Sequence, residues 1–92
     1  MLQNIGAEDF RRVQAVRQTV GPDISIRLDA NQGWKPKEAV RLIRRMEDAG
    51  LDIELVEQPV AAWDFEGLKQ VTDHVDTDVM AGGETLAVHL WY

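Results

Sequence analysis

A strand, a helix and a second strand are predicted by residues 24–59, ISIRLDANQGWKPKEAVRLIRRMEDAGLDIELVEQP. Apolar and polar residues alternate over residues 24–29, as is typical of a β-strand, and residues 53–57 predict another strand that Pro59 ends. Between the strands, apolar positions recur at helical spacing after Pro36, and proline is tolerated in the first turn of a helix. Because strands joined by such a helix run in parallel with a right-handed connection, the predicted fold class is α/β with a parallel sheet.

The same alternation of helix and strand extends to both sides of this unit. Residues 7–20 predict a helix that Gly21 ends, Asp64 is a suitable N-cap for a third helix, and residues 79–81 predict a third strand. The chain is therefore expected to form a single domain, residues 1–92, of about three βα units. The helical side chains expected to be buried are Phe10, Val13, Val16 and Val20 in the first helix, Ala39, Ile43 and Met46 in the second, and Phe65, Leu68, Val71 and Val75 in the third.

Composition narrows the classes of partner. The net charge is −6 and there is no cysteine. An acidic chain is a poor partner for nucleic acid or an anionic membrane, since both attract clustered Lys and Arg, but it is compatible with a divalent cation. The absence of cysteine excludes disulfide and thiolate chemistry. Residues 1–6 lack the pattern of a signal peptide and no apolar run approaches the length of a membrane span, so a cytoplasmic location is the default expectation.

Three carboxylates follow the three predicted strands. Asp29 ends the first strand, Glu57 ends the second, and Glu84 follows the third. In a parallel sheet these positions share the carboxyl-terminal edge, where α/β proteins place their sites. A hard divalent cation would offset the repulsion between the carboxylates, and oxygen ligands favour Mg²⁺ over zinc. Each residue alone has a simpler interpretation, because acids after strands often cap helices or turns, and Gly82-Gly83 could form a flexible turn or, more weakly, a phosphate-binding loop.

Several stretches resemble the mandelate racemase and muconate lactonising branch of the enolase superfamily. DANQGW at residues 29–34 resembles the segment at the third barrel strand of that branch, and VEQPV at residues 56–60 resembles the segment at its fourth strand. Residues 53–81, with AAWDFEGL at residues 61–68, are similar to the dipeptide epimerases that act on L-Ala-D/L-Glu. The resemblance covers residues 6–84 and implies that the chain is a segment of a (β/α)8 barrel, or TIM barrel.

The resemblance also implies a chemistry. In that family Asp29 and Glu57 would be the first two Mg²⁺ ligands, and Asn31 and Gln58 would be polar groups that surround and orient the site. Family members take a proton from the carbon beside a carboxylate, in a small carboxylate or dipeptide substrate. Mg²⁺ stabilises the enediolate that forms, and a lysine on each face of the substrate exchanges the proton.

The sequence departs from the family pattern in three places. The family's Lys-x-Lys pair corresponds to Leu2 and Asn4, neither of which can act as a base near neutral pH. In the epimerases the family's third metal ligand lies in an Ala-Asp-Glu-Ser segment, but the matching stretch here is AGGET at residues 81–85, in which the Asp is absent. Glu84 is the candidate instead, in the manner of the Gly-Glu segment of racemase- and dehydratase-like members. A complete barrel needs about 250 residues, so the sixth-strand lysine and the substrate-capping domain are not expected within these 92 residues.

The sequence therefore favours a fragment of a Mg²⁺-dependent enzyme of the racemase, epimerase or cycloisomerase type, with no catalytic base assigned in this chain. One alternative is a non-catalytic metal-binding or self-associating α/β domain, and another is a small α/β domain with its ligand at Gly82-Gly83. Self-association is expected because an open three-stranded sheet leaves its edges unpaired. The apolar tail, residues 87–92, is expected to pack on a missing partner element or on another chain.

Four side chains outside the proposed site are given structural roles. Trp34 and Trp63 are expected to pack at the starts of loops. Asp9 is expected in the first turn of the first helix, where the helix dipole favours acids. Arg27 is expected to face the barrel interior beside Asp29 and to form an ion pair there.

Overall fold

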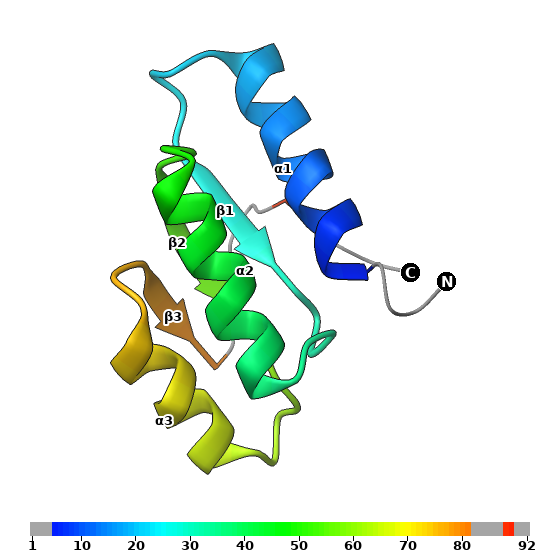
Figure 1. Ribbon diagram of the computed structural model, residues 1–92, viewed down its shortest axis with the longest axis vertical. Coiled ribbons are helices and arrows are strands. Elements are labelled where there is room, and N and C mark those ends of the chain that lie inside the picture. Colours follow the sequence, from blue (N-terminus) through cyan, green and yellow to red (C-terminus); the bar gives the residue numbers. More distant parts are fainter. Residues whose placement is uncertain (1–4, 82–87, 90–92) are drawn as a thin grey trace.

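The computed structural model describes residues 5–81 and 88–89, which form three helices and four strands (Figure 1). The elements in chain order are α1 (Ile5–Val20), β1 (Ile26–Asp29), α2 (Pro36–Asp48), β2 (Ile53–Glu57), α3 (Phe65–His74), β3 (Asp78–Met80) and β4 (Val88–His89). Helices and strands alternate up to β3, which confirms the predicted α/β class.

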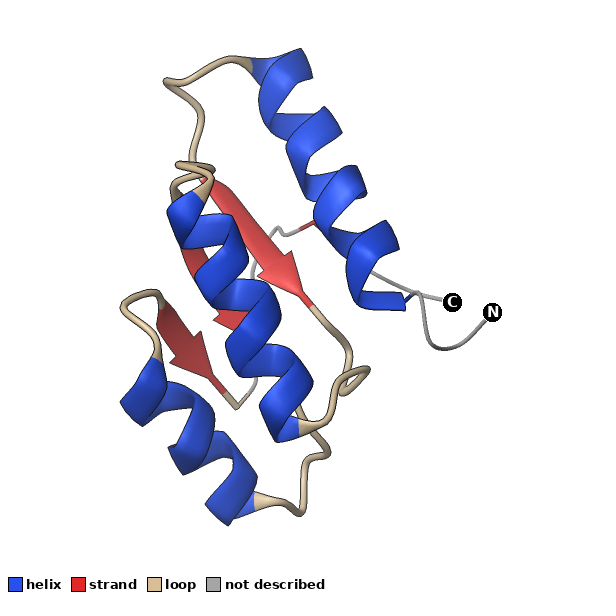
Figure 2. Ribbon diagram, viewed as in Figure 1, coloured by secondary structure: helices blue, strands red, loops and turns tan. Residues whose placement is uncertain are grey.

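All strand pairs are parallel, and the sheet has the order β3-β2-β1-β4. The three helices cover one face of this sheet, with α2 lying between α1 and α3 (Figure 2). Because every strand points the same way, the carboxyl ends of β1, β2 and β3 share one edge, which we call the carboxyl edge.

The fourth strand corrects the expectation for the apolar tail. The tail was predicted to need a missing partner element or another chain. Instead, Val88 pairs with Leu28 and His89 pairs with Asp29, so this part of the tail adds a short strand to the outer edge of β1. The physical reason is that the outer edge of β1 otherwise presents unpaired N–H and C=O groups, which a nearby extended segment can satisfy.

The core lies between the sheet and its helices. It contains the predicted faces of α2 and the inner side chains of β1 and β2, and the largest fully buried apolar side chains are Val13, Leu28, Ile43, Met46, Val56 and Val71. Two predictions at helix ends are wrong, because Val20 is exposed and Phe65 is 75% exposed. Val20 ends α1 and Phe65 begins α3, so each lies where its helix has fewer neighbours.

Arg17 fixes the opposite, amino-terminal edge of the sheet. Its Nε donates to the carbonyl of Leu51 (2.9 Å), and its terminal nitrogens donate to the carbonyls of Gly21 (2.8 Å), Ile24 (2.7 Å) and Asp52 (3.0 Å). One side chain therefore ties the end of α1 to the segments that lead into β1 and β2. Nothing in the sequence pattern distinguished Arg17 from a solvent-exposed helical residue.

Candidate metal centre

Asp29 and Glu57 lie side by side at the carboxyl edge. They are the last residues of β1 and β2, and the register of the two parallel strands makes their Cα atoms partners. Their preceding residues, Leu28 and Val56, are fully buried, so alternation along each strand directs both carboxylates to the face that the helices do not cover. Neighbouring strands lie about 4.8 Å apart, a spacing at which two carboxylates can approach one cation. Glu57 is only 2% exposed, although it lies on this uncovered face.

The loop after β1 holds one oxygen of Asp29. The backbone N–H of Asn31 donates to Asp29 Oδ1 at 2.8 Å. Asn31 and Gln32 both adopt left-handed backbone conformations, with φ of 49° and 61°. Asn is among the residues that tolerate this conformation best, and the turn it makes points its N–H back at the carboxylate two residues earlier. The Asn-Gln-Gly sequence therefore orients Asp29 as well as ending the strand.

Backbone hydrogen bonds continue past the ends of β1 and β2. We call residues 30–34 the DANQGW loop, because they follow Asp29 in the DANQGW motif at residues 29–34. Three of their backbone N–H groups donate to the carbonyls of residues 57–59. The bonds run from Ala30 N to Glu57 O (2.9 Å), from Gln32 N to Gln58 O (2.6 Å) and from Trp34 N to Pro59 O (3.1 Å). The two family-like motifs are thus joined directly, and neither carboxylate is carried on a free loop.

The remaining predicted site residues are placed only in part. Asn31 is exposed and Gln58 is half-buried, and the N–H of Gln58 donates to the carbonyl of Met80 at 2.8 Å, which links the site to β3. Glu84 lies outside the described residues. Among the residues that the structure does describe, no group of three His, Cys, Asp or Glu side chains could hold a metal ion. The described part of the chain therefore contributes two carboxylates to the predicted centre.

The ion pair of Arg27 differs from the prediction. Arg27 was expected to pair with Asp29, but it bonds to Glu54 at 3.2 Å. An irregularity in the β1–β2 register places Arg27 opposite Leu55 and leaves Glu54 as the extra residue of β2, within reach of the guanidinium. The bond to Glu54 and its charge raise the pKa of Arg27, with a smaller contribution from Glu57. Positive charge is therefore kept close to the buried Glu57.

Comparison with known proteins identifies the family. Residues 3–89 match the family model described as enolase C-terminal domain-like. The chain belongs to this family. The match confirms the resemblance inferred from the DANQGW and VEQP segments, and related structures belong to the mandelate racemase and muconate lactonising branch of the enolase superfamily.

Dipeptide epimerases are among the similar family members. The L-Ala-D/L-Glu epimerase of Bacillus subtilis strain 168 is 63% identical over 75 residues, which are 82% of this chain and 20% of the epimerase. The substrate-liganded structure of that epimerase superposes with a TM-score of 0.81 at 61% identity, covering 82% of this chain and 21% of that one. A dipeptide epimerase from Enterococcus faecalis V583, complexed with Mg and L-Leu-L-Tyr, gives a TM-score of 0.74 at 56% identity over 78% of this chain and 20% of that one. This enolase-family chain thus spans about a fifth of the length of these relatives.

Asp9 has a different role from the predicted one. Asp9 was attributed to the first turn of α1, but α1 begins at Ile5, and Asp9 is 0% exposed. Its Oδ2 accepts a hydrogen bond from Nε1 of Trp34 at 2.7 Å. Burial raises the pKa of Asp9, and the bond from Trp34 opposes that rise. The available signal was spacing, because Asp9 precedes Val13 by four residues and therefore lies on the buried stripe of the helix.

The two tryptophans behave differently. Trp34 is buried, as predicted, but Trp63 is 79% exposed, so its predicted packing role is wrong. Trp63 lies in the loop before α3, two residues ahead of the exposed Phe65. Nearby, the side-chain oxygen of Gln32 accepts a hydrogen bond from the N–H of Ala62 at 3.0 Å, so this loop is fixed to the DANQGW loop through its backbone.

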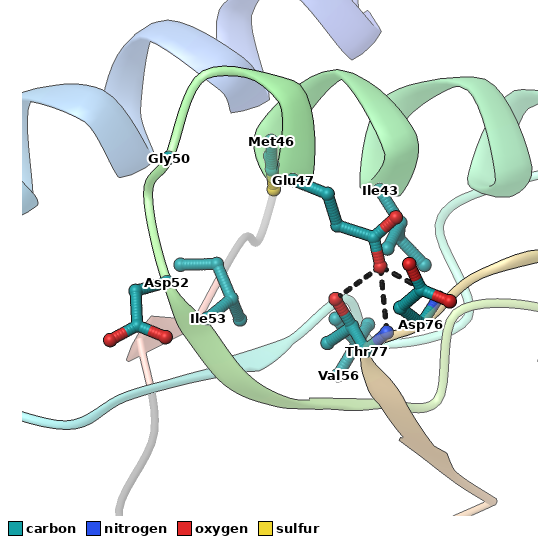
Figure 3. A pocket seen from close by; sticks show the side chains of 9 residues that line it. All are labelled: Ile43, Met46, Glu47, Gly50, Asp52, Ile53, Val56, Asp76 and Thr77. Atoms are coloured by element: carbon teal, nitrogen blue, oxygen red, sulfur yellow. Dashed lines mark hydrogen bonds between the residues drawn. The ribbon is translucent and has the colours of Figure 1, made fainter.

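A cleft of about 350 Å³ lies at the amino-terminal edge between α2, β2 and the loop before β3 (Figure 3). It contains three acids, but Asp52 points away from Glu47 and Asp76 (Figure 3). Glu47 accepts hydrogen bonds from the N–H of Asp76 (2.8 Å), the N–H of Thr77 (2.6 Å) and the hydroxyl of Thr77 (2.7 Å). These contacts join α2 to the entrance of β3, so Glu47 has a structural role in this cleft.

None of the described helices is long and apolar enough to cross a membrane.

Proposed function

We propose that this chain forms part of the (β/α)8 barrel of a Mg²⁺-dependent enolase-superfamily enzyme of the racemase, epimerase or cycloisomerase type. Membership of the family and the all-parallel sheet support the proposal. The activity of the whole enzyme, proton removal from the carbon beside a carboxylate, is proposed from relatives of which this chain spans about a fifth.

The pairing of Asp29 with Glu57 carries the proposal. In it, these two carboxylates and Glu84 are the Mg²⁺ ligands, and Asn31 and Gln58 orient the site. Two carboxylates on paired positions repel each other, and burial of Glu57 increases the free-energy cost of its charge. A hard divalent cation offsets both costs, and a donor set made only of oxygens fits Mg²⁺. A relative at 56% identity was crystallised with Mg, which agrees with this choice of metal.

The residues of this chain have distinct parts in that chemistry. When bound, Mg²⁺ would supply positive charge against the substrate carboxylate as the neighbouring carbon loses its proton. The N–H of Asn31 holds Asp29 Oδ1, and the backbone bonds between the DANQGW loop and residues 57–59 keep the two ligands together. Leu2 and Asn4, at the family's lysine positions, have no group that accepts a proton near neutral pH. We therefore propose that the chain by itself binds metal and does not catalyse the reaction, and that its substrate class is a small carboxylate or dipeptide.

Binding of Mg²⁺ to the purified chain tests the proposal. Isothermal titration calorimetry and thermal melting should show binding, with a gain of about 2.7 kcal/mol in the free energy of unfolding at a hundred times the dissociation constant. Asp29→Ala and Glu57→Ala should abolish the gain. Asp48→Ala is the control, because Asp48 is an exposed acid at the end of α2, far from the carboxyl edge. A parent chain that binds no Mg²⁺, or an Asp48→Ala variant as defective as Glu57→Ala, would refute the metal site. The same samples should leave the α-proton of L-Ala-D-Glu unexchanged in D₂O.

A self-associating, non-catalytic α/β domain is the second candidate function. It is favoured by β3, which ends the described sheet with β2 as its only neighbour, and by the exposed side chain of Met80 on that strand. The acidic net charge of −6 supports the expectation that neither nucleic acid nor an anionic membrane is the partner.

A further inference from the structure

A buried hydrogen bond connects α1 to the loop that follows the proposed metal ligand Asp29. Asp9 is 0% exposed, and its Oδ2 accepts from Nε1 of Trp34 at 2.7 Å. Trp34 is itself buried and ends the DANQGW loop. A short bond between two side chains shielded from water holds both in one relative orientation, because no solvent partner is available to replace it.

The DANQGW loop is short enough to transmit the position of Trp34 to Asp29. The N–H of Gly33 donates to the carbonyl of Ala30 at 2.9 Å, which closes a tight turn. A Cβ atom on Gly33 would lie 2.9 Å from that same oxygen, so this turn requires glycine at position 33. Inside this turn, the N–H of Asn31 reaches Asp29 Oδ1. A shift of Trp34 therefore displaces the group that orients the carboxylate.

Packing alone does not explain why an aspartate occupies position 9. Its second oxygen, Oδ1, is buried without a hydrogen-bond partner in the described structure. A buried acceptor that loses water and gains no donor destabilises the folded state. An apolar residue at this position on α1 would avoid that loss and still cover the indole ring. Only an oxygen acceptor also fixes the orientation of the indole ring, because it accepts a hydrogen bond from the ring N–H.

We propose that Asp9 is a positioning residue for the metal centre, which holds Trp34 and through it the DANQGW loop, so that Asp29 and Asn31 are set before the cation binds. The inference rests on the proposed Mg²⁺ site at Asp29 and Glu57. It assigns to α1, which contributes no ligand, a part in the affinity of that site.

Three variants separate positioning from packing. Asp9→Ala removes the acceptor, Trp34→Phe removes the donor but keeps an aromatic ring, and Asp9→Asn keeps an oxygen that can accept from the indole. Asp9→Ala and Trp34→Phe should weaken Mg²⁺ binding about tenfold by calorimetry, since the loss of groups that orient metal ligands costs 10- to 100-fold in affinity. Asp9→Asn should bind within about twofold of the parent. Arg17→Lys is the control, because Arg17 stabilises the opposite edge of the sheet.

Amide hydrogen exchange of the metal-free chain provides a readout that does not depend on Mg²⁺. Asp9→Ala should speed exchange at Asn31 and Gly33, and Arg17→Lys should not. Unchanged Mg²⁺ affinity in Asp9→Ala and Trp34→Phe, with both variants folded by circular dichroism, would overturn the positioning role, as would an Asp9→Asn variant as weak as Asp9→Ala. If the parent binds no Mg²⁺, the proposed metal site fails, and exchange then decides alone whether Asp9 orders the loop. Unchanged exchange at Asn31 and Gly33 in Asp9→Ala would show that Asp9 does not order the DANQGW loop.

Discussion

Burial of Asp9 gives the stability of the fold a pH dependence opposite to that of most paired carboxylates. Loss of water raises the pKa of Asp9 from its ordinary value of 3.8, and the charge of Glu8 adds to the rise, while Trp34 and Arg12 oppose it. Between 3.8 and the raised value, the folded chain keeps a proton that the unfolded chain has lost. The free energy of unfolding contributed by this group therefore falls as the pH rises through that window.

Replacement of Asp9 by Asn should remove this dependence. Asp9→Asn should gain stability relative to the parent as the pH rises from below 3.8 to neutral, and the difference should vanish at the acid end, where both side chains are neutral. Urea unfolding across this pH range measures the difference. Asp23→Asn is the control, since Asp23 is exposed. A difference between Asp9→Asn and the parent that stays constant with pH would contradict the prediction.

Among single residues, the apolar side chains in the middle of the helices were predicted well, whereas those at the helix ends and the charged side chains were predicted poorly. Helical spacing located Ile43 and Met46 in the core because burial of an apolar stripe follows from local geometry. The roles of Asp9, Arg17 and Arg27 depend on partners 25 or more residues away, at Trp34, at Leu51 and Asp52, and at Glu54. Such partners follow from tertiary packing, which the spacing of charges along the chain does not encode.

Between elements, Glu47 is the main polar connection from α2 to the entrance of β3. One of its oxygens accepts from two backbone N–H groups and one hydroxyl, at Asp76 and Thr77 (Figure 3). Hydrogen bonds to a charged acceptor each stabilise by about 1.5–3 kcal/mol, and partial exposure reduces the sum. Glu47→Ala should therefore lower the free energy of unfolding by about 2 kcal/mol, and Glu47→Gln by about half as much, because a neutral oxygen accepts more weakly.

Urea unfolding of both variants checks this prediction, with Asp48→Asn as the control on the exposed side of the same helix. Mg²⁺ affinity should be unchanged in Glu47→Ala, since the connection lies at the edge of the sheet opposite Asp29 and Glu57. A Glu47→Ala variant as stable as the parent would show that water replaces the carboxylate without loss.

The elements themselves were predictable where local chemistry sets their limits. Residues 53–57 were predicted and observed as β2, Asp64 caps α3 by accepting from the N–H of Gly67 at 2.9 Å, and Gly50 ends α2 with a φ of 69°. The first strand begins two residues later than predicted, at Ile26, because Ile24 is exposed and outside the sheet. The pairing of β4 with β1 was missed because it joins residues sixty positions apart by backbone bonds, which leave little trace in the side-chain pattern.

At the scale of the whole molecule, the parallel α/β fold agrees with the family, but the described sheet is open. The sequence motifs were sufficient to predict the family and the register of Asp29 with Glu57, since a parallel sheet brings equal positions to one edge. They do not specify what covers the sheet face that carries those carboxylates, because in the described structure all three helices lie on the other face (Figure 2). We propose this face and the free edge of β3 in the described sheet as the surfaces through which another copy of the chain would bind.

Self-association through β3 should respond to a single charge on that strand. A chain that pairs at this edge would bury the exposed 42% of Met80, and this burial stabilises by about 1 kcal/mol, since complete burial of a Met side chain contributes about 1.5–3 kcal/mol. Met80→Lys should therefore raise the dissociation constant of the oligomer by about tenfold, because it removes this burial and lysine on an edge strand opposes pairing. Sedimentation velocity over a concentration series measures the effect. Gln70→Lys is the matched control, since it adds the same charge at an exposed position on α3. A parent chain that remains monomeric throughout, or equal effects of the two lysines, would exclude β3 as the interface and leave the uncovered sheet face as the surface to test.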